Sequence, residues 1–168
     1  MAAAVDLPLS LSVIIPVLNE AEVIVPTLDR LQPLRQRGHE VIVVDGGSDD
    51  NTIELCLPLV DRIFKSESGR ALQMNAGAKL SRADVLWFLH ADTLIESDYD
   101  TVIINLLSRT TKQWGWFNIR LSGSQLMLRF VERLINLRSY LTGIATGDQG
   151  ILYAENVLLN WMDFPINH

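Results

Sequence analysis

Three turns of this sequence carry acidic side chains directly after apolar segments, in positions where they could bind a metal ion or a nucleotide. The turns are Asn19-Glu20, Asp45-Gly46-Gly47-Ser48-Asp49-Asp50 and His90-Ala91-Asp92. Carboxylate oxygens suit Mg²⁺ and Mn²⁺, and they also accept hydrogen bonds from the N–H groups of a nucleobase. One acidic turn is ordinary, whereas three that each end an apolar segment indicate a binding site.

Apolar segments with the composition of buried strands precede these turns. They are expected at residues 10–18, 40–44 and 84–89. Segments with helical spacing lie at 21–34, 52–59 and 69–81, and a further short strand is expected at 61–65. This alternation predicts an α/β fold with a mostly parallel central sheet and helices on both faces. Ligands bind at the carboxyl ends of the strands in such sheets, so the three turns should line one edge.

The pattern changes after residue 97. A helix is expected at 99–107, a strand at 114–121, an amphipathic helix at 125–141, a strand at 150–153 and a helix at 156–162. The amphipathic helix either packs on the core or forms an apolar lip that faces an acceptor or a membrane. The same two interpretations, core packing or an apolar lip, apply to the aromatic residues Trp114, Trp116 and Phe117. The helix is basic in an otherwise acidic chain, since it carries Arg129, Arg133 and Arg138.

Length and composition set broad limits. The 168 residues suffice for one domain, and the net charge of −6 is unfavourable for a nucleic-acid partner. Cys56, the only cysteine, is expected to be a small buried apolar residue, which fits a reducing compartment. Residues 1–6 lack the basic and apolar regions of a signal peptide, and no apolar run is long enough to span a bilayer. A cytoplasmic protein is therefore expected, with peripheral membrane contact left open.

The acidic turns and their flanking residues resemble the opening motifs of family 2 glycosyltransferases, which have the GT-A fold. The similar segments are Ser12-Val13-Ile14-Ile15-Pro16-Val17-Leu18-Asn19-Glu20, Val44-Asp45-Gly46-Gly47-Ser48-Asp49-Asp50, Gly69-Arg70-Ala71-Leu72-Gln73-Met74-Asn75-Ala76-Gly77-Ala78, His90-Ala91-Asp92 and Thr146-Gly147-Asp148-Gln149-Gly150. This combination is most similar to a small bacterial subgroup of glycosyltransferase-like transferases. The resemblance implies one domain over residues 1–168, with a nucleotide-binding half at 10–93 and a partial acceptor half at 94–168.

The resemblance also implies a role for individual residues. Nucleotide binding is expected from Pro16, Asn19, Glu20, Asp45, Gly46, Arg70 and Ala91. Asp92 stands where the family carries the last acid of its Asp-x-Asp motif, which binds the divalent metal that bridges the phosphates of a UDP- or GDP-linked sugar. His90 replaces the first acid and favours Mn²⁺ over Mg²⁺ as the metal. Gly147 and Gln149 are expected to contact the acceptor.

Structural roles compete with these functional ones. Asp45 could belong to a plain turn in which Ser48 or Asp49 caps the following helix. Arg70 could be a solvated residue of the first helical turn, and His90 could simply close its strand. Residues 147–150 could form a tight turn before an edge strand. Two further residues of the 69–81 helix, Asn75 and Gly77, are expected to pack where the helix crosses the sheet.

An inverting sugar transfer needs a base that takes the proton of the acceptor hydroxyl. The family carries this acid in a Glu-Asp pair after Gly-Phe-Pro; here Asp163-Phe164-Pro165 takes that place, and no such pair follows before His168. Asp148 is the remaining candidate in the chain, and a second copy in a homo-oligomer is another source of an acid.

Three functions fit the sequence to different degrees. The first is an inverting glycosyltransferase, and the second is a truncated or degenerate nucleotide-sugar-binding module without transferase activity. A nucleotidyltransferase is disfavoured, because Pro16-Val17-Leu18-Asn19-Glu20 lacks a glycine-rich, basic loop.

Overall fold

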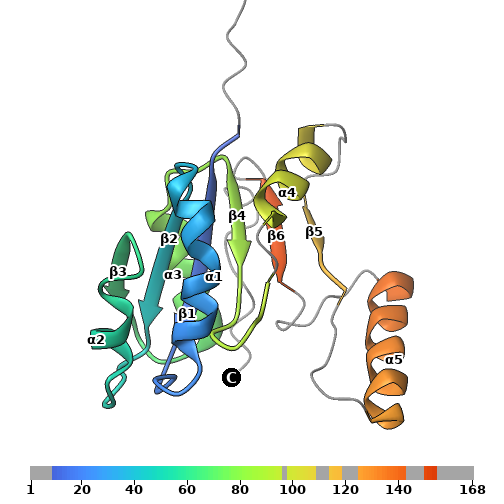
Figure 1. The fold of residues 1–168 in the computed structure, drawn as a ribbon, viewed down its shortest axis with the longest axis horizontal. Helices are drawn as coiled ribbons and strands as arrows, with labels where there is room; N and C mark the ends of the chain where they lie inside the picture. The colour runs from blue at the N-terminus through green and yellow to red at the C-terminus, as the bar shows by residue number, and fades with distance from the viewer. Residues whose placement is uncertain (1–8, 96–97, 109–113, 119–124, 143–149, 155–168) are drawn as a thin grey trace, which may run out of the picture.

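A mixed sheet forms the centre of the molecule (Figure 1). The computed structural model describes residues 9–95, 98–108, 114–118, 125–142 and 150–154. In these ranges the strands are β1 Leu11–Val17, β2 Glu40–Asp45, β3 Arg62–Lys65, β4 Val85–Phe88, β5 Trp114–Trp116 and β6 Ile151–Ala154. The helices are α1 Ile24–Gln36, α2 Thr52–Cys56, α3 Arg70–Leu80, α4 Tyr99–Ser108 and α5 Leu126–Thr142.

The described strands lie in the order β3-β2-β1-β4-β6-β5. β1 pairs in parallel with both β2 and β4, so that Ile14 lies opposite Ile42 on one side and Phe88 on the other. β2 and β3 are also parallel, whereas β6 is antiparallel to both β4 and β5. The predicted α/β fold with a mostly parallel sheet is therefore confirmed.

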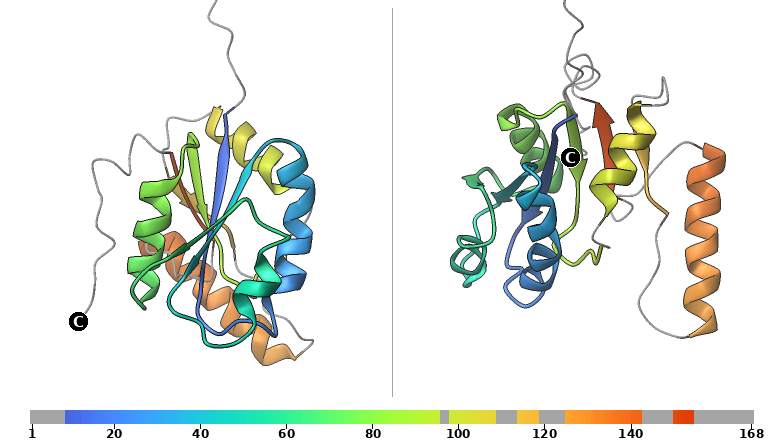
Figure 2. Two further views of the ribbon diagram at one scale, coloured as in Figure 1. Left: turned by 90° about the vertical axis from the view of Figure 1, so that its left-hand side faces the viewer. Right: turned by 45° about the horizontal axis from the view of Figure 1, so that its top comes forward.

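Alternate residues of the strands face two separate apolar layers. Val13 and Ile15 of β1 pack in the larger layer with residues of α1 and with Ile103 of α4. Ile14 points to the other face, where Met74 of α3 completes a smaller cluster. Figure 2 shows α1 and α4 on one side of the sheet and α3 on the other. The expected helices on both faces are thus present.

Helix α3 lies unusually close to the sheet at Gly77. A Cβ atom at this position would stand 2.4 Å from Cγ2 of Ile14 and 3.1 Å from Cγ2 of Val44. Only a residue without a side chain fits such a contact. The predicted packing role of Gly77 is confirmed, and Asn75 is half-buried in the same helix.

Several predicted boundaries differ from the structure. α1 begins at Ile24 and ends at Gln36, whereas the spacing predicted residues 21–34. Residues 21–23 form a turn because the N–H groups of Val23 and Ile24 both donate to the carbonyl of Glu20. The strand predicted at 114–121 is shorter, since β5 ends at Trp116, and the helix predicted at 156–162 lies outside the described residues.

The alternative in which Ser48 or Asp49 caps the second helix does not hold. α2 begins only at Thr52, with Asn51 at the N-cap and no side-chain hydrogen bond from that cap. Ser48 and Asp49 lie too early in the chain to cap it. The N–H of Thr52 donates instead to Oδ1 of Asp50, at 2.9 Å.

The aromatic residues beyond residue 97 divide between core and surface. Phe117 packs against Trp87 and Tyr99, with ring centroids 5.6 and 4.9 Å apart. Trp114 stacks near Trp116 and keeps 42% of its surface exposed. α5 lies beyond β5 at the outer side of the molecule (Figure 1). No helix in the described ranges is long and apolar enough to cross a membrane.

Candidate functional site at the carboxyl edge of the sheet

The three acidic turns emerge along one edge of the sheet. β1, β2 and β4 are parallel neighbours, so their carboxyl ends lie side by side. Val17 lies opposite Asp45 at the last pair of β1 and β2, and the N–H of Gly46 donates to the Val17 carbonyl at 2.9 Å. After β4, the chain continues through Leu89 to His90 at the same edge. The expected arrangement of the turns is confirmed.

Asn19 joins the first turn to the second. Its φ of 56° is in the left-handed region, which asparagine tolerates better than most residues. Its N–H donates to Oγ of Ser48 at 3.0 Å, and its own Oδ1 accepts from the N–H of Asp49 at 2.9 Å. The turns after β1 and β2 are therefore held as one unit, beside half-buried Pro16.

Glu20 is the half-buried carboxylate of this unit. Its backbone N–H donates to Oγ1 of Thr52 at 2.9 Å. Burial raises the pKa of Glu20 above its ordinary value, the negative charges of Asp92 and Asp50 raise it further, and the charge of Arg70 opposes them. Residues from four separate segments thus share one electrostatic environment, with two carboxylates besides Glu20 and one guanidinium.

Asp45 is fully buried at the end of β2, although it is acidic. Its Oδ1 accepts a hydrogen bond from the N–H of Ser48 at 2.9 Å. Its Oδ2 has no hydrogen-bond partner among the described residues. A buried carboxylate oxygen without a donor is costly, and a donor from a bound ligand would remove that cost. Asp45 therefore has an unused hydrogen-bond acceptor at the carboxyl end of β2.

Gln73 is a residue of this region that sequence reasoning missed. Its side chain is buried, and Nε2 donates to the carbonyls of Val17 and Val44, at 2.7 and 2.8 Å. A Cβ atom on Gly46 would lie 3.1 Å from the Gln73 carboxamide. Gln73 thus fixes the ends of β1 and β2 against α3. The available signal was its spacing of four from Gly77, which places both residues on one helix face.

The turn after β4 presents one buried and one exposed residue. Ala91 is buried, and its carbonyl accepts a hydrogen bond from Oγ1 of Thr27 at 2.7 Å. The N–H of Thr93 donates to the His90 carbonyl at 3.2 Å, which closes the turn. Asp92 is exposed as a result, while His90 is half-buried. The carboxylate of Asp92 is held at the edge by a turn that is itself anchored to α1.

Helix α3 starts at the same edge. Arg70 is its first residue and is exposed, and Gly69 precedes it with a φ of 141°. The N-terminus of a helix together with a guanidinium attracts anions. No group of three His, Cys, Asp or Glu side chains in the described parts of the chain is placed to hold a metal ion by itself.

The expected acceptor residues cannot be placed at this edge. Gly147, Asp148 and Gln149 lie outside the described residues, so the roles of the candidate base and of its neighbours stay predictions. Gly150, which follows them, has a φ of 56° and packs beside the Trp87 indole. Asp163, which is not a candidate base, also lies outside the described ranges.

Comparison with known sequences shows a family match. The model of the family described as Glycosyl transferase family 2 matches residues 12–144. The poly-beta-1,6-N-acetyl-D-glucosamine synthase of Staphylococcus aureus is 35% identical to the chain over 86 residues. The aligned part is 48% of this chain and 21% of that protein, so the chain spans about a fifth of the relative's length.

Comparison with solved structures shows the same architecture. TarS from S. aureus in complex with UDP-GlcNAc superimposes with a TM-score of 0.72 and 20% identity, over 93% of this chain and 48% of that one. The mannosyltransferase PcManGT from Pyrobaculum calidifontis, in complex with GDP-Man and Mn²⁺, gives a TM-score of 0.70 and 22% identity, over 94% and 48%. These likenesses concern the fold, and they confirm the expected GT-A architecture.

Proposed function

We propose, because this chain belongs to glycosyl transferase family 2, that the turns after β1, β2 and β4 bind a nucleoside diphosphate sugar. The observation that carries the proposal is the buried Oδ2 of Asp45, which lacks a hydrogen-bond donor among the described residues. In this proposal the N–H of a pyrimidine or guanine base supplies that donor. Gly46 makes room for the Gln73 carboxamide, and Gly47, with no atom within 4 Å of its Cβ position, leaves the backbone open to a flat base.

The diphosphate would extend from the base toward Arg70 and Asp92. The charges of both residues act on the pKa of Glu20, which supports one shared binding region. A helix N-terminus with an arginine suits a phosphate group. The mannosyltransferase and TarS structures, which hold GDP-Man and UDP-GlcNAc, support a nucleotide sugar as the ligand class.

The donor groups of the third turn fit a divalent metal that is shared with a phosphorylated ligand. Such a metal needs only one or two carboxylates from the protein, because phosphate oxygens complete its coordination. Asp92 offers an exposed carboxylate, and His90 offers an imidazole that Mn²⁺ accepts better than Mg²⁺. We assign the metal to Asp92 with His90 beside it; when bound, the metal would offset charge on the departing nucleotide diphosphate.

Sugar transfer is the finer part of the proposal. An inverting transfer requires a base near the acceptor hydroxyl, and Asp148 is our candidate for it. Gly147 and Gln149 are the proposed acceptor contacts. The acceptor itself is left unassigned, because the described residues contain no group whose chemistry selects one.

Calorimetric titration of the chain with UDP, GDP, UDP-GlcNAc and GDP-Man, each with and without Mn²⁺, tests the binding proposal. We expect Asp45→Asn to weaken nucleotide binding about ten-fold or more with or without metal, because a charge-assisted hydrogen bond is lost. Asp92→Asn should abolish the effect of Mn²⁺ instead. Asp29→Asn, an exposed change on α1, is the matched control and should bind like the parent protein. Binding to none of the four nucleotides would overturn the proposal.

A second assay separates transfer from binding alone. Release of UDP or GDP from the sugar donors would show turnover, and NMR of the product would show the anomeric configuration. We expect Asp148→Asn to lower turnover by about a hundred-fold while nucleotide binding is kept. Unchanged turnover in Asp148→Asn would remove it as the base, and binding without any turnover would favour a binding module.

A further inference from the structure

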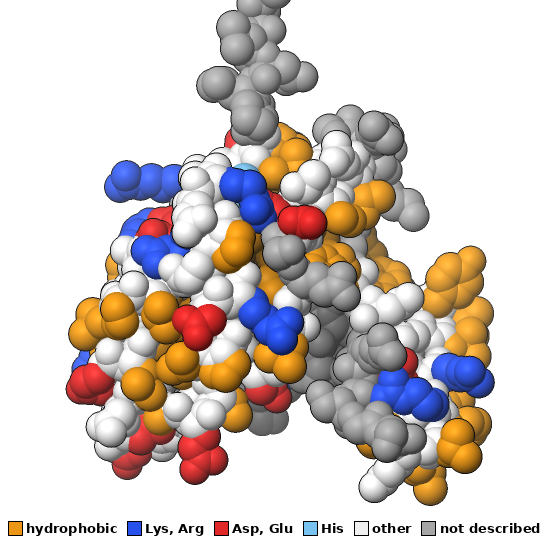
Figure 3. All heavy atoms as spheres, viewed as in Figure 1, with side chains coloured by type: hydrophobic (Ala, Val, Ile, Leu, Met, Phe, Trp, Pro, Cys, Tyr) orange, Lys and Arg blue, Asp and Glu red, His pale blue; other side chains and the backbone are white. Residues whose placement is uncertain are grey.

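Helix α5 turns a broad apolar side away from the rest of the molecule. Leu126 is 87% exposed and Tyr140 is 80% exposed, which is far more than apolar residues of a packed helix retain. The other exposed apolar residues of α5 are Met127, Phe130, Val131, Leu134, Leu137 and Leu141. Figure 3 shows hydrophobic side chains gathered along this helix, with basic side chains beside them.

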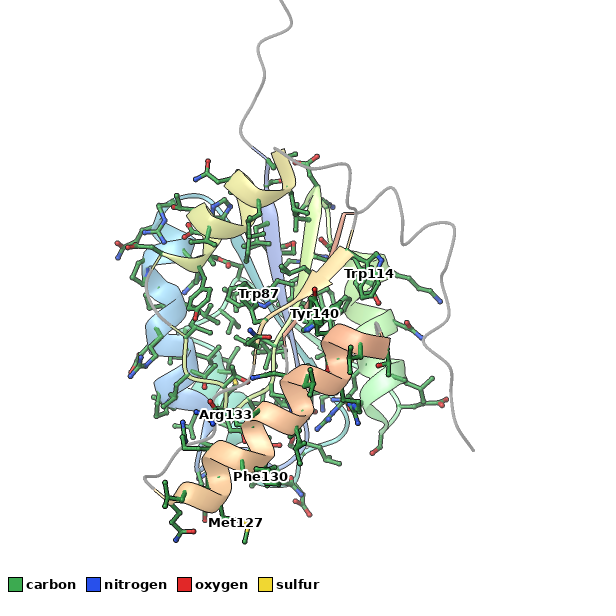
Figure 4. The ribbon with its side chains drawn as sticks, turned by 90° about the vertical axis from the view of Figure 1, so that its right-hand side faces the viewer. Trp87, Trp114, Met127, Phe130, Arg133 and Tyr140 are labelled. Carbon is green, nitrogen blue, oxygen red and sulfur yellow. The ribbon has the colours of Figure 1, made fainter. Side chains whose placement is uncertain are left out.

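Six of these exposed apolar residues form one continuous stripe. Successive helical residues are about 100° apart, so residues 126, 130, 134, 137 and 141, together with 127, fall within about a third of the circumference. The opposite side carries Leu128, Ile135 and Ser139, which are half-buried or buried. Only a narrow side of α5 is therefore buried, and Figure 4 shows the helix across the outer face with Met127, Phe130 and Tyr140 labelled.

Arginine residues border the apolar stripe on both sides. On the helical projection Arg133 lies next to one border and Arg138 next to the other. α5 contains three arginines and one acid, Glu132, and that acid pairs with Arg129 at 2.7 Å. With three arginines and one glutamate α5 is net positive, whereas the whole chain has a net charge of −6.

We propose that the exposed side of α5 docks on a membrane surface rich in anionic phospholipid. The apolar stripe would enter the boundary of the acyl chains, while Arg133 and Arg138 remain at the level of the phosphates. The helix lies in the plane of the membrane in this arrangement and does not cross it, in agreement with its length of 17 residues and its arginines.

The charges favour lipid over a second copy of the chain. Two copies that met through this stripe would bring the flanking arginines of both helices to one interface, where like charges repel. Phosphates of an anionic bilayer neutralise the same arginines. The exposed apolar residues need a partner in either case, because a stripe of this size is unfavourable in water.

Sedimentation of the chain with vesicles tests the proposal without any nucleotide, so it is independent of the proposed function. The vesicles are phosphatidylcholine alone or an equal mixture of phosphatidylcholine and phosphatidylglycerol. We expect binding to the mixture, weaker binding to phosphatidylcholine, and a loss of binding at high salt. Replacing both Arg133 and Arg138 by Gln should weaken binding to the mixture about five-fold for each residue.

Two matched pairs of variants identify the surface. Phe130→Ser with Leu134→Ser should weaken binding to both vesicles about ten-fold or more, since apolar burial is lost. Leu55→Ser with Leu57→Ser, at the end of α2, and Lys79→Gln with Arg82→Gln, near the other end of the sheet, should bind like the parent protein. The four leucine and phenylalanine positions that are changed to serine are exposed, so these variants should fold. Circular dichroism verifies their folding. Absence of vesicle binding, or a dimer that Phe130→Ser with Leu134→Ser dissociates, would overturn the proposal.

Discussion

At the scale of single residues, burial decides what the charged groups of this protein do. Asp100 of α4 is almost fully buried, yet it is ionised beside Arg37, whose Nε and Nη2 donate to its two oxygens at 2.5 and 2.8 Å. His39 Nε2 lies 3.4 Å from the same carboxylate. This cluster joins the end of α1 to α4. It lies at the amino ends of the strands, opposite to the candidate site. It is structural, whereas the buried Oδ2 of Asp45 has no hydrogen-bond partner among the described residues and is proposed to accept one from a ligand.

The cluster predicts a loss of stability in acid. Burial lowers the pKa of His39. The positive charge of Arg37 lowers it further, whereas the negative charge and the hydrogen bond of Asp100 oppose the shift. Burial opposes ionisation of Asp100, but the hydrogen bond from Arg37, the Thr101 N–H and the charges of Arg37 and His39 outweigh it and lower that pKa. For both groups the unfolded chain takes up a proton before the folded chain does, so stability falls as pH falls.

Urea denaturation at a series of pH values checks this. The His39 contribution should be lost from about pH 7 downward and that of Asp100 from about pH 4 downward, each with a slope of at most about 1.4 kcal/mol per pH unit. His39→Gln should flatten the upper part of the profile, and Asp100→Asn the lower part at a reduced overall stability. His90→Gln, at the other edge, should retain the contribution of His39. An unchanged upper slope in His39→Gln would contradict the assignment.

At the scale of elements, α3 sets the shape of the candidate site. Gly77 brings the helix into contact with the sheet, and Gln73, one turn earlier, then reaches the carbonyls of Val17 and Val44. The two residues together fix where β1 and β2 end. The position of Asp45 therefore depends on the contacts of α3 with the ends of β1 and β2.

Gly77→Ala should destabilise the protein by about 2 kcal/mol, because the new methyl group overlaps Ile14 and Val44. The sign is informative, since alanine is favoured over glycine in a helix by about 1 kcal/mol when space is available. Gly115→Ala is the matched control: no atom lies within 4 Å of its Cβ, and its stability should change little. Chemical denaturation measures both. Ile14→Ala combined with Gly77→Ala should cost less than the sum of the two single changes.

The sequence predicted the parallel half of this architecture because its strands are apolar throughout. Such segments have to be covered on both faces, and parallel neighbours then bring their terminal turns to one edge. Asp45, Asp92 and Arg70 could be assigned to that edge from the order of segments alone. Their detailed functional roles are proposals that the binding experiments test.

Other features depended on contacts that no local pattern contains. Ser48 lies too early in the chain to cap α2, and its hydroxyl instead accepts the N–H of Asn19 from another turn. Gln73 resembles any polar residue of a helix until the two carbonyls that it satisfies are known. Periodicity showed that α5 has an apolar side, but only the arrangement of elements shows that this side faces outward. Gly147, Asp148 and Gln149 remain predictions because they lie outside the described residues.

At the scale of the whole molecule, the chain divides into a core around the parallel strands and a peripheral α5. β1 and β2 are almost entirely buried, and residues from α1, α3 and α4 pack on them. α5 exposes most of its apolar residues. The proposed nucleotide-binding edge belongs to the core, whereas the proposed membrane surface belongs to the periphery. The two should therefore respond to different ligands.

Hydrogen exchange followed by mass spectrometry tests this division. We expect amides of β1, β2 and β4 to exchange slowest and those of α5 to exchange roughly a hundred-fold faster or more, because a helix with few packed residues opens locally. α4, which buries Asp100 and Ile103, is the internal control and should be slower than α5. UDP with Mn²⁺ should slow exchange in residues 19–21, 45–52 and 90–93 and leave α5 unchanged, while anionic vesicles should slow α5 alone. Equal protection of α5 and β1 in the free protein would contradict a peripheral α5, and protection of α5 by nucleotide would show that the two parts are coupled.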